Sequence, residues 1–463
     1  MLTKLKPISG YAETKFVNCY EIFASDLKNI KDTLIFAKKN SLSICSKGGG
    51  YSYGDSITNE KNIILNTSKM NKILNYDKDN GFITVEPGVS IAQILEIILI
   101  DNWTISANPG SFDVTIGGAI SNNIHGKDSY SEGNFISNVK LINVLLSSGE
   151  EIICSREENI ELFNYIHGGI GLFGIITKII LKLKKIPSPY VEKTNFKAKD
   201  INELIKIFEC NKNKYDFMVA WVDAFAKGKS LGRGFIECGK WTSKSSRETN
   251  IEIKESLTKS NKIFNLLPKK LTWMLVKPFF NRFFLKLFNI FFYNYNSIFK
   301  SQKIYKILYT KYNFIHNYIP DFKNLFRPYG FIELQPLIPV EKSNQCMRLI
   351  LRLCQKYQFE SMLAGFKLHR KDGTSLSYSL DGYSIGIVLS LKKSKKSKIS
   401  EFTSELFEII NKFNGIIYLA KDEVLSKKYF NTMYPNHKEF NIIKKKYDPN
   451  NLFNSDLYKR LIN

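Results

Sequence analysis

The stretch SKGGGYSYGD, at residues 46–55, is the most informative part of this sequence. Its three consecutive glycines follow a short apolar run, and their missing side chains let the backbone turn back and bring its N–H groups close to a pyrophosphate. Ser52 can add a hydroxyl group, and Tyr53 can add an aromatic face beside a ring. The spacing matches neither the G-x-G-x-x-G dinucleotide fingerprint nor a Walker A loop. A glycine-rich hairpin without a ligand is the alternative for this stretch taken alone.

Two more glycine-rich stretches follow, NPGSFDVTIGGAISNNIHGKDS at residues 108–129 and HGGIGLFGIIT at residues 167–177. In the first of them, Pro109-Gly110 forces a turn and the glycine pair at 117–118 allows close approach of a ligand. Ordering so irregular a segment costs free energy unless something fills it. Polar groups are concentrated there at Asn122, Asn123 and His125. The alternative for His125 is a hydrogen-bonded histidine in the core.

The composition, with 44% hydrophobic and 24% charged residues, is that of a folded globular protein, and 463 residues suit two domains. The 67 Lys and Arg outnumber the 43 Asp and Glu, which gives a formal net charge of +24. Such an excess favours an anionic partner, such as nucleic acid, an acidic membrane surface or a phosphorylated substrate. A lysine-rich composition along the whole chain explains the charge equally well, so charge alone decides nothing.

Seven scattered cysteines show no C-x-x-C spacing, which favours neither a zinc site nor a disulfide framework; they are Cys19, Cys45, Cys154, Cys210, Cys238, Cys346 and Cys354. Reduced thiols in a cytosolic setting are the simplest account. Residues 1–15 lack the apolar core of a signal peptide. No stretch reaches about 18 consecutive apolar residues, so we expect no transmembrane helix.

Periodicity predicts short strands alternating with helices up to about residue 189, followed by a second region of mixed structure. In the first region we expect a helix at 91–99 and strands at 41–45, 63–65, 81–86, 139–146 and 175–183. The run KKIPSPY at residues 184–190 is a plausible boundary. In the second region we expect helices at 344–356 and 398–413 and strands at 331–338, 384–391 and 415–420.

The order of the three glycine-rich stretches, together with YDPNNLFNSDL at residues 447–457, resembles the FAD-linked oxidases of the vanillyl-alcohol-oxidase type. These enzymes carry an FAD-binding domain of the PCMH type, and the likeness covers most of residues 10–461. Within the family it is greatest for oxidases of polyprenyl-phosphate-linked pentoses. The resemblance implies an α+β fold in two domains, with FAD-binding residues 1–189, an antiparallel-sheet substrate domain at 190–413 and a segment at 414–463 that returns to the flavin domain.

Carried over by position, the resemblance implies flavin contacts at Lys47, Gly48, Gly49, Gly50, Tyr51, Ser52, Tyr53, Gly54, Asp55, Gly110, Thr115, Ile116, Gly117, Gly118, Asn122, Asn123, His125, Ile176 and Tyr418. Members that bind flavin covalently through the first loop have a histidine where this chain has Tyr51. Residues 108–127 also contain no cysteine for a second attachment. We therefore expect non-covalent FAD, and no metal.

The family's substrate-binding positions fall on His125, Lys127, Arg327, Gln335, Lys367 and Lys421. Its paired glutamines fall on Glu333 and Gln335, so an acid replaces one amide. Its Asn-Ile-Cys falls on Ser384-Ile385-Gly386, so a pocket cysteine is absent. These changes leave the oxidation chemistry in place and leave the identity of the sugar open.

Oxidation of an alcohol by a flavin needs a group that takes the hydroxyl proton as the hydride leaves. The first candidate is Lys421, which we expect just past the end of a strand, partly desolvated and without a fixed partner, with a lowered pKa. Tyr53 is the second. Lys367 and Arg327 suit an anionic phosphate, because cationic donors form charge-assisted hydrogen bonds with it. For each lysine, the alternative is a solvated surface charge.

The segment LTWMLVKPFFNRFFLKLFNIFFYNYN, at residues 271–296, alternates bulky apolar residues with Lys277, Arg282 and Lys286, and Pro278 interrupts any helix. It is too charged to span a bilayer but suits a position at the bilayer surface. An amphipathic helix that covers the substrate domain is an equally good interpretation.

The resemblance implies oxidation of a secondary alcohol, the 2′-hydroxyl of a polyprenyl-phosphate-linked pentose, as the oxidase half of an epimerase in cell-envelope biosynthesis. A short-chain-type reductase would be its partner, and we expect a cytoplasmic protein, peripheral at the inner face of the membrane. The enzymatic alternative is a sugar-1,4-lactone or aldose oxidase on a soluble substrate. A basic membrane-surface protein without activity is the third possibility, but it leaves the glycine loops without a purpose. We expect no nucleic-acid partner.

Overall fold

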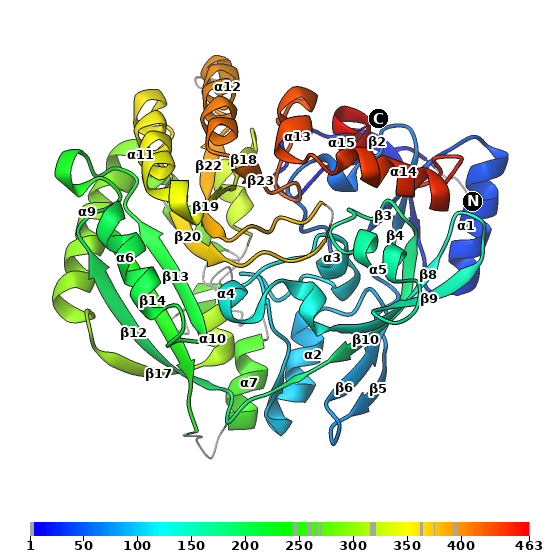
Figure 1. Ribbon diagram of the computed structural model, residues 1–463, viewed down its shortest axis with the longest axis horizontal. Helices are drawn as coiled ribbons and strands as arrows, with labels where there is room; N and C mark the ends of the chain where they lie inside the picture. Colours follow the sequence, from blue (N-terminus) through cyan, green and yellow to red (C-terminus); the bar gives the residue numbers. More distant parts are fainter. Residues whose placement is uncertain are drawn as a thin grey trace.

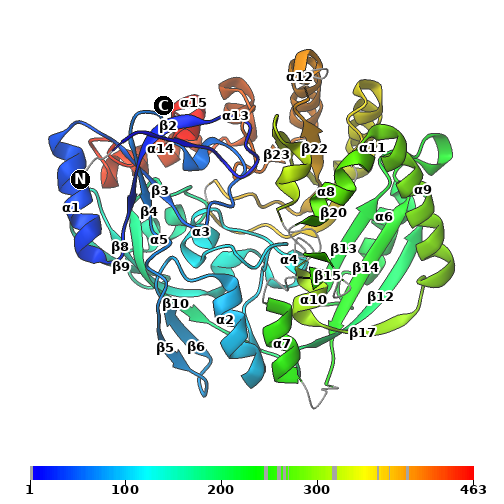
Figure 2. The same ribbon diagram turned by 180° about the vertical axis from the view of Figure 1, so that it is seen from behind.

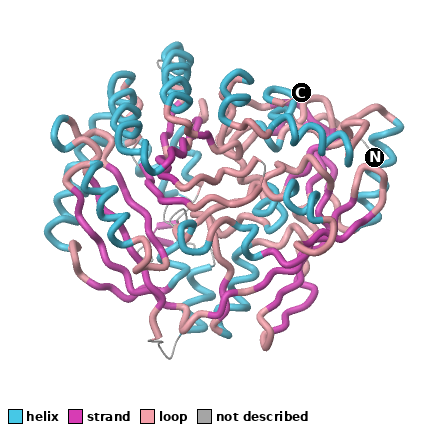
Figure 3. The backbone as a smooth tube through the Cα atoms, in the orientation of Figure 1, coloured by secondary structure: helices cyan, strands magenta, loops and turns pink. Residues whose placement is uncertain are grey.

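The computed structural model describes residues 4–243, 249–257, 262–263, 267–268, 271–314, 321–361, 364–374, 376–392 and 396–462. Three larger sheets and the helices that pack on them form an α+β fold, as the sequence predicted (Figure 1). In the tube drawing, the strands gather into separate groups on the two sides of the molecule, with loops between them (Figure 3). The cavity described below is lined by loops and strand ends from both groups.

The N-terminal sheet holds the first glycine-rich stretch at the end of a strand. Its order is β1 (Lys6–Ile8), β2 (Val17–Phe23), β4 (Ile63–Asn66) and β3 (Ile44–Lys47). β2, β4 and β3 are parallel, with α1 (Leu27–Lys39) between β2 and β3 in the chain. Asp26 caps α1 by accepting a hydrogen bond from the Asn29 amide. The glycines therefore begin where β3 ends.

The second sheet carries the other two glycine-rich stretches in its connections. Its strands are all antiparallel, in the order β5 (Ile73–Asp77), β6 (Phe82–Val85), β10 (Ile175–Lys182), β8 (Val139–Leu145) and β9 (Glu151–Ser155). Between them come α2 (Ile91–Ile98), α3 (Ile116–Ser121), α4 (Ser129–Glu132) and α5 (Ile160–Ile166). The strands and the helix predicted in this region are confirmed, with ends shifted by up to three residues. A capping box of Ser90 and Gln93 begins α2.

The third sheet is antiparallel and has eight strands, in the order β17 (Ile304–Leu308), β12 (Tyr190–Ala198), β14 (Gly234–Trp241), β13 (Phe217–Val222), β20 (Ala364–His369), β21 (Gly382–Ile385), β19 (Pro336–Pro339) and β23 (Ile416–Ile417). Its longer helices are α6 (Ile201–Asn211), α11 (Val340–Tyr357) and α12 (Lys396–Lys412). The short helices α7 (Thr249–Leu257) and α10 (Tyr309–Asn313) lie near its lower end in Figure 1.

Two strands predicted as continuous are each interrupted. The stretch at 331–338 forms β18 (Phe331–Leu334) and β19, which break at Gln335. The stretch at 384–391 breaks at Gly386, between β21 and β22 (Ile387–Ser390). β18 pairs with β22 in a separate two-stranded sheet, while β19 pairs with β21 in the large one. Gln335 and Gly386, the residues at the two breaks, both line the cavity.

The C-terminal segment leaves the large sheet after β23 and packs against the N-terminal one. Its helices are α13 (Lys427–Met433), α14 (His437–Tyr447) and α15 (Asp456–Leu461), which lie beside the blue N-terminal strands in Figure 1. The Ile44 amide donates to the Leu452 carbonyl at 2.7 Å, and the Asn454 amide donates to the Ile44 carbonyl at 2.8 Å. These bonds attach the segment to β3, next to the glycines.

The aromatic segment forms α8 (Thr272–Val276) and α9 (Arg282–Phe299), separated by a short turn of 3-10 helix at Lys277–Phe279. The interruption at Pro278 is confirmed. Asn281 caps α9 by accepting a hydrogen bond from the Phe284 amide. Among the described residues, no helix is both long enough and apolar enough to cross a membrane.

Candidate active site

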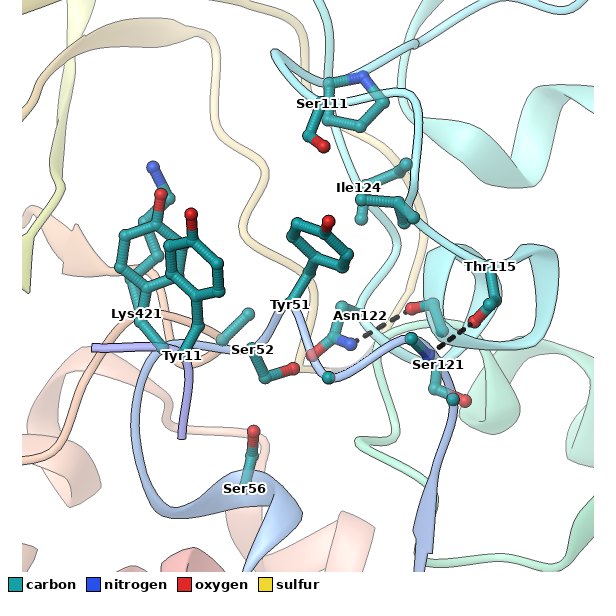
Figure 4. A pocket seen from close by; sticks show the side chains of 18 of the residues that line it. Tyr11, Tyr51, Ser52, Ser56, Ser111, Thr115, Ser121, Asn122, Ile124 and Lys421 are labelled. Carbon is teal, nitrogen blue, oxygen red and sulfur yellow. Dashed lines mark hydrogen bonds between the residues drawn. The ribbon is translucent and has the colours of Figure 1, made fainter. Parts of the chain in front are cut away.

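A cavity of about 370 Å³ brings all three glycine-rich stretches together with strands of the large sheet. Its size falls in the range typical of small-molecule sites, which is about 300–1,000 Å³. The predicted residues that line it are Lys47, Gly48, Gly49, Gly50, Tyr51, Ser52, Tyr53, Gly110, Thr115, Gly117, Gly118, Asn122, His125, Lys127, Ile176, Gln335, Lys367, Tyr418 and Lys421. Figure 4 shows part of this wall from close by.

Four predicted flavin contacts lie behind the wall and support it. A Cβ atom on Gly54 would stand 1.9 Å from the Asp422 carbonyl oxygen, so this glycine allows close backbone packing. Asp55 forms a two-pronged ion pair with Arg460 at 2.8 and 2.9 Å. Asn123 donates to Asp372 at 2.7 Å and accepts from the Ile136 amide at 3.1 Å. The fourth, Ile116, is fully buried in the core.

Arg327, a predicted substrate residue, lies outside the described lining residues. Its guanidinium donates two hydrogen bonds of 2.6 Å to the carboxylate of Glu13, and its side chain is half exposed. Lys323 adds a second cation to the same carboxylate. The sequence could not reveal this pairing, because 314 residues separate the two partners. The structure therefore gives no support for Arg327 as a phosphate ligand inside the cavity.

The first two glycine-rich loops touch each other and form a cradle. The Gly49 amide donates to Thr115 Oγ1 at 3.3 Å. A Cβ atom would lie 2.2 Å from Thr115 Oγ1 if built on Gly48, and 3.0 Å from the Asp113 carbonyl oxygen if built on Gly49. Gly50 has a φ of +76°, which favours glycine. Side chains at these glycines are thus excluded on steric grounds where the two loops meet beside the cavity.

Three buried polar atoms in the wall have no hydrogen-bond partner: Ser56 Oγ, Asn108 Oδ1 and Asn122 Oδ1. Leaving such atoms unsatisfied costs about 1–3 kcal/mol each, so a polar ligand is expected to satisfy them. Together with the glycine cradle, they fit the hydrogen-bonding and close approach that FAD requires. The residues present are therefore suited to hold that cofactor.

Tyr51 and Tyr11 form an aromatic pair at the edge of the cradle. Their rings are stacked with centroids 5.4 Å apart, and Tyr51 donates its hydroxyl to Asp113 Oδ2 at 2.8 Å. Figure 4 shows the two side chains projecting to the same side of the loop. Sequence reasoning missed Tyr11, for which this chain gives no local signal. It also missed Asp113, although that residue lies inside the second glycine-rich stretch.

Lys421 lies in a turn after β23, as predicted, but the expectation that it has no fixed partner is wrong. Its Nζ lies 2.5 Å from Glu333 Oε1, and it also lies over the Tyr53 ring at 5.2 Å from the centroid. Glu333 occupies a position where the resemblance expects glutamine, and only the fold shows that its carboxylate meets this lysine. An ammonium group held by a carboxylate is a well-oriented hydrogen-bond donor.

Lys367 and His125 both have lowered pKa values. Burial, followed by the positive charges of Lys421 and Lys127, lowers the pKa of Lys367 to about 7. Burial and the neighbouring Lys367 hold the pKa of His125 well below its usual 6.5, so the imidazole is neutral. The two side chains are in contact, with Lys367 Nζ 3.5 Å from His125 Nδ1. On the other side of the ring, Gln335 Nε2 lies 3.2 Å from His125 Nε2.

Two other candidates have more limited chemistry. Lys127 donates to Glu237 Oε1 at 2.9 Å and to the Tyr312 carbonyl at 2.6 Å, so its ammonium is anchored in the wall. Burial and the Glu333 carboxylate raise the pKa of Tyr53 well above 10.0. A phenol with a raised pKa stays protonated at neutral pH, so it can donate a hydrogen bond but is a poor general base there.

Among the described residues, no group of three or more His, Cys, Asp or Glu side chains could hold a metal ion.

Comparison with known proteins agrees with this geometry. A family model described as FAD binding domain matches residues 20–155. A second model, described as D-arabinono-1,4-lactone oxidase, matches residues 183–461. Together the two models cover the glycine cradle as well as Lys367 and Lys421.

Individual proteins resemble this chain over different shares of its length. The decaprenylphosphoryl-beta-D-ribose oxidase of Mycolicibacterium smegmatis is 26% identical over 430 residues, which cover 92% of this chain and 90% of that protein. The L-gulonolactone oxidase of Bos taurus is 25% identical over 41% of this chain and 44% of its own length. The carbohydrate oxidase of Microdochium nivale is 28% identical over 35% of this chain and 33% of its own length.

Proposed function

This chain belongs to the D-arabinono-1,4-lactone oxidase family and is an FAD-dependent oxidoreductase, and on that basis we propose that it oxidises a secondary alcohol of a lipid-linked sugar. The proposed substrate is a polyprenyl-phosphate-linked pentose, and the proposed reaction is oxidation at its 2′-hydroxyl. The observation that carries the proposal is the length of the similarity to the Mycolicibacterium smegmatis oxidase, which includes the substrate side of the cavity. The lactone and carbohydrate oxidases match less than half of this chain.

Two lysines of the cavity, Lys367 and Lys421, have separate roles in the proposed reaction. FAD, when bound, supplies the acceptor for the hydride that leaves the alcohol carbon. Lys367 takes the hydroxyl proton, because a group with a pKa of about 7 is half deprotonated at neutral pH and is an effective base there. Lys421, oriented by Glu333, donates a hydrogen bond to the substrate oxygen. Neutral His125 holds Lys367 in place.

The proposed reaction also implies a partner and a location. The ketone product would be reduced from the opposite face by a separate short-chain-type reductase, which would complete an epimerisation. We propose that this takes place in the cytoplasm, at the inner face of the membrane, as a step of cell-envelope biosynthesis.

A second candidate function is oxidation of a soluble sugar lactone or aldose. The observation in its favour is Glu333, whose carboxylate lines the cavity and would repel a phosphate group placed close to it. The description of the matching family model points the same way.

Anaerobic mixing experiments separate the two candidates. We expect the yellow colour of the purified enzyme to bleach with a polyprenyl-phosphoryl pentose and to persist with the free pentose, a pentono-1,4-lactone or an aldose. Bleaching by the soluble compounds alone would establish the second candidate instead. A purified protein without any flavin would contradict both.

We expect the FAD to be released by acid precipitation, because Tyr51 holds the position of the attachment histidine. None of the seven cysteines is among the described residues that line the cavity. The flavin absorbance should therefore appear in the supernatant after the protein is pelleted in trichloroacetic acid. Absorbance that remains with the pellet, and with a peptide after proteolysis, would show a covalent bond.

A further inference from the structure

The helix α9 has a mixed inward face and leaves most of its apolar side chains exposed to solvent. Its buried side chains are Asn289, Tyr293 and Asn296. On the outer side lie Phe283, Phe284, Leu287, Phe288, Ile290, Phe291, Tyr295, Ile298 and Phe299, all of them exposed. A helix that simply covers the sheet would bury most of its apolar side chains, because burial stabilises them.

The inward orientation of α9 is fixed by specific contacts. Tyr293 donates its hydroxyl to the Ala198 carbonyl at 3.3 Å, and Arg233 lies over its ring at 4.3 Å. Trp221 meets Phe292 edge-on at 4.8 Å. Arg282, at the start of the helix, pairs with the buried carboxylate of Glu360. The apolar side of α9 is therefore held outward, and the packing interpretation of this segment does not account for it.

The exposed surface continues along α8 and the turn that follows it. Leu271, Met274, Leu275 and Phe279 are exposed there, and so the apolar strip runs from α8 to the end of α9. The 18 residues of α9 alone span about 27 Å. We call the strip formed by the exposed apolar residues of 271–299 the aromatic ridge. Figures 1 and 2 both show α9 at the outer edge of the molecule, on the side away from the flavin domain.

The aromatic ridge connects to the cavity through packed aromatic rings. From Phe280, next to the ridge, ring contacts lead to Phe326 at 5.0 Å, then to Phe331 at 4.5 Å and to Tyr53 at 5.5 Å in the cavity wall. A second connection runs along β13, where Val219 lines the cavity and Trp221, two residues further on the same face, touches α9. The ridge thus lies beside the substrate side of the site.

The charge of this segment is uniformly positive. Residues 271–306 contain six cationic side chains and no acidic one: Lys277, Arg282, Lys286, Lys300, Lys303 and Lys306. Lys277 and Lys286 are exposed among the apolar residues of the ridge. This combination of exposed aromatic rings and interspersed lysines is what a bilayer surface with anionic headgroups accommodates. A protein partner for a surface without acids would itself need an acidic, apolar face.

We propose that the aromatic ridge docks the enzyme on an anionic lipid bilayer, with the rings inserted at the level of the acyl chains and the lysines at the headgroups. Docking places the substrate side of the cavity next to the membrane surface. The proposal rests on the exposed surface of 271–306 and holds whether the sugar substrate is lipid-linked or soluble. Its test can therefore fail or succeed independently of the substrate experiment.

Flotation with lipid vesicles tests the ridge directly. The FAD-loaded protein should float with vesicles made of equal parts phosphatidylcholine and phosphatidylglycerol, and less with phosphatidylcholine alone. The triple variant Phe283→Asn, Phe291→Asn, Ile298→Asn removes side chains that are 67%, 66% and 70% exposed. Each replacement should weaken binding about tenfold or more, because a buried apolar side chain of this size contributes that much.

A control variant removes a similar amount of exposed apolar surface elsewhere on the molecule. Phe16, Ile35 and Ile442 are 59%, 66% and 66% exposed on the flavin side of the molecule, and their triple replacement by Asn should leave flotation unchanged. Lys277→Gln with Lys286→Gln should weaken binding about fivefold per lysine. Added salt should weaken it too. Flavin content should be unaffected in every variant.

Three results would overturn the proposal. The first is failure of the wild-type protein to float with anionic vesicles at low salt. The second is equal loss of flotation in the control variant, which would mean that the ridge contributes no more to vesicle binding than exposed apolar residues elsewhere. The third is self-association in vesicle-free solution that the ridge variant abolishes, because a second copy of the chain would then be the occupant.

Discussion

Gly49→Val is expected to give a colourless protein that has lost its FAD. A Cβ atom at this position would already lie 3.0 Å from the Asp113 carbonyl oxygen and 3.3 Å from Thr115 Cγ2. The two further methyl groups of valine must then occupy the cradle that the loops leave open for the cofactor. We expect no absorbance near the flavin maximum after purification, and no recovery after incubation with excess FAD.

Two further variants make this result interpretable. Gly118→Val should also lose FAD. Apart from the backbone of its own helix, a Cβ atom there would meet only Thr115 Oγ1, at 3.2 Å, so this substitution should disturb folding of the apoprotein less than Gly49→Val does. Gly373→Val should keep its flavin, because a Cβ there meets nothing within 4 Å and Gly373 is not among the described lining residues. Normal flavin content in both cradle variants would place the cofactor elsewhere.

Lys367→Met is expected to slow the reduction of bound flavin by substrate about 100- to 10,000-fold, which is the usual contribution of a general base. Below a pH of about 7 Lys367 is protonated and cannot take the proton, and above it the amine is free. The wild-type kcat/KM should therefore rise as pH increases through about 7. This rise should be absent in Lys367→Met, while the flavin spectrum stays normal.

Lys421→Met serves as the matched variant for the other lysine. It removes the donor that Glu333 orients, so it should slow the same step while the rise with pH near 7 remains. Anaerobic stopped-flow absorbance at several pH values measures both variants. If Lys367→Met keeps the rise with pH and a near wild-type rate, Lys367 is not the base. If Lys421→Met alone loses the rise with pH, the roles of the two lysines are reversed.

The glycine-rich loops and most of the cavity wall could be predicted from sequence, because their residue types have few other uses. A glycine such as Gly49, where a side chain would clash, is constrained locally and can be recognised in the chain. The strands predicted at 63–65 and 175–183 were also found, since a run of apolar residues specifies burial directly.

Long-range pairing of charges could not be predicted in this way. Glu333 and Lys421 are 88 residues apart, and Glu13 and Arg327 are 314 residues apart. Nothing local distinguishes Arg327, which is half exposed, from Lys367, which lines the cavity and is mostly buried, because burial depends on the complete fold. The interruption at Gln335 has the same origin: β18 and β19 pair with different partners, and only those partners define the break.

The attachment of the C-terminal segment to β3 has a consequence for biosynthesis. Arg460 holds Asp55 from 405 residues downstream, and residues 452–454 complete the hydrogen bonding of Ile44. At about 5–20 residues per second, the ribosome needs roughly 20–80 s to synthesise the chain between these partners. Until then, the edge of β3 beside the glycines is unpaired, and unpaired strand edges promote aggregation. During that interval we expect the nascent chain to be prone to aggregation, and we expect the cofactor site beside β3 to be completed only after it.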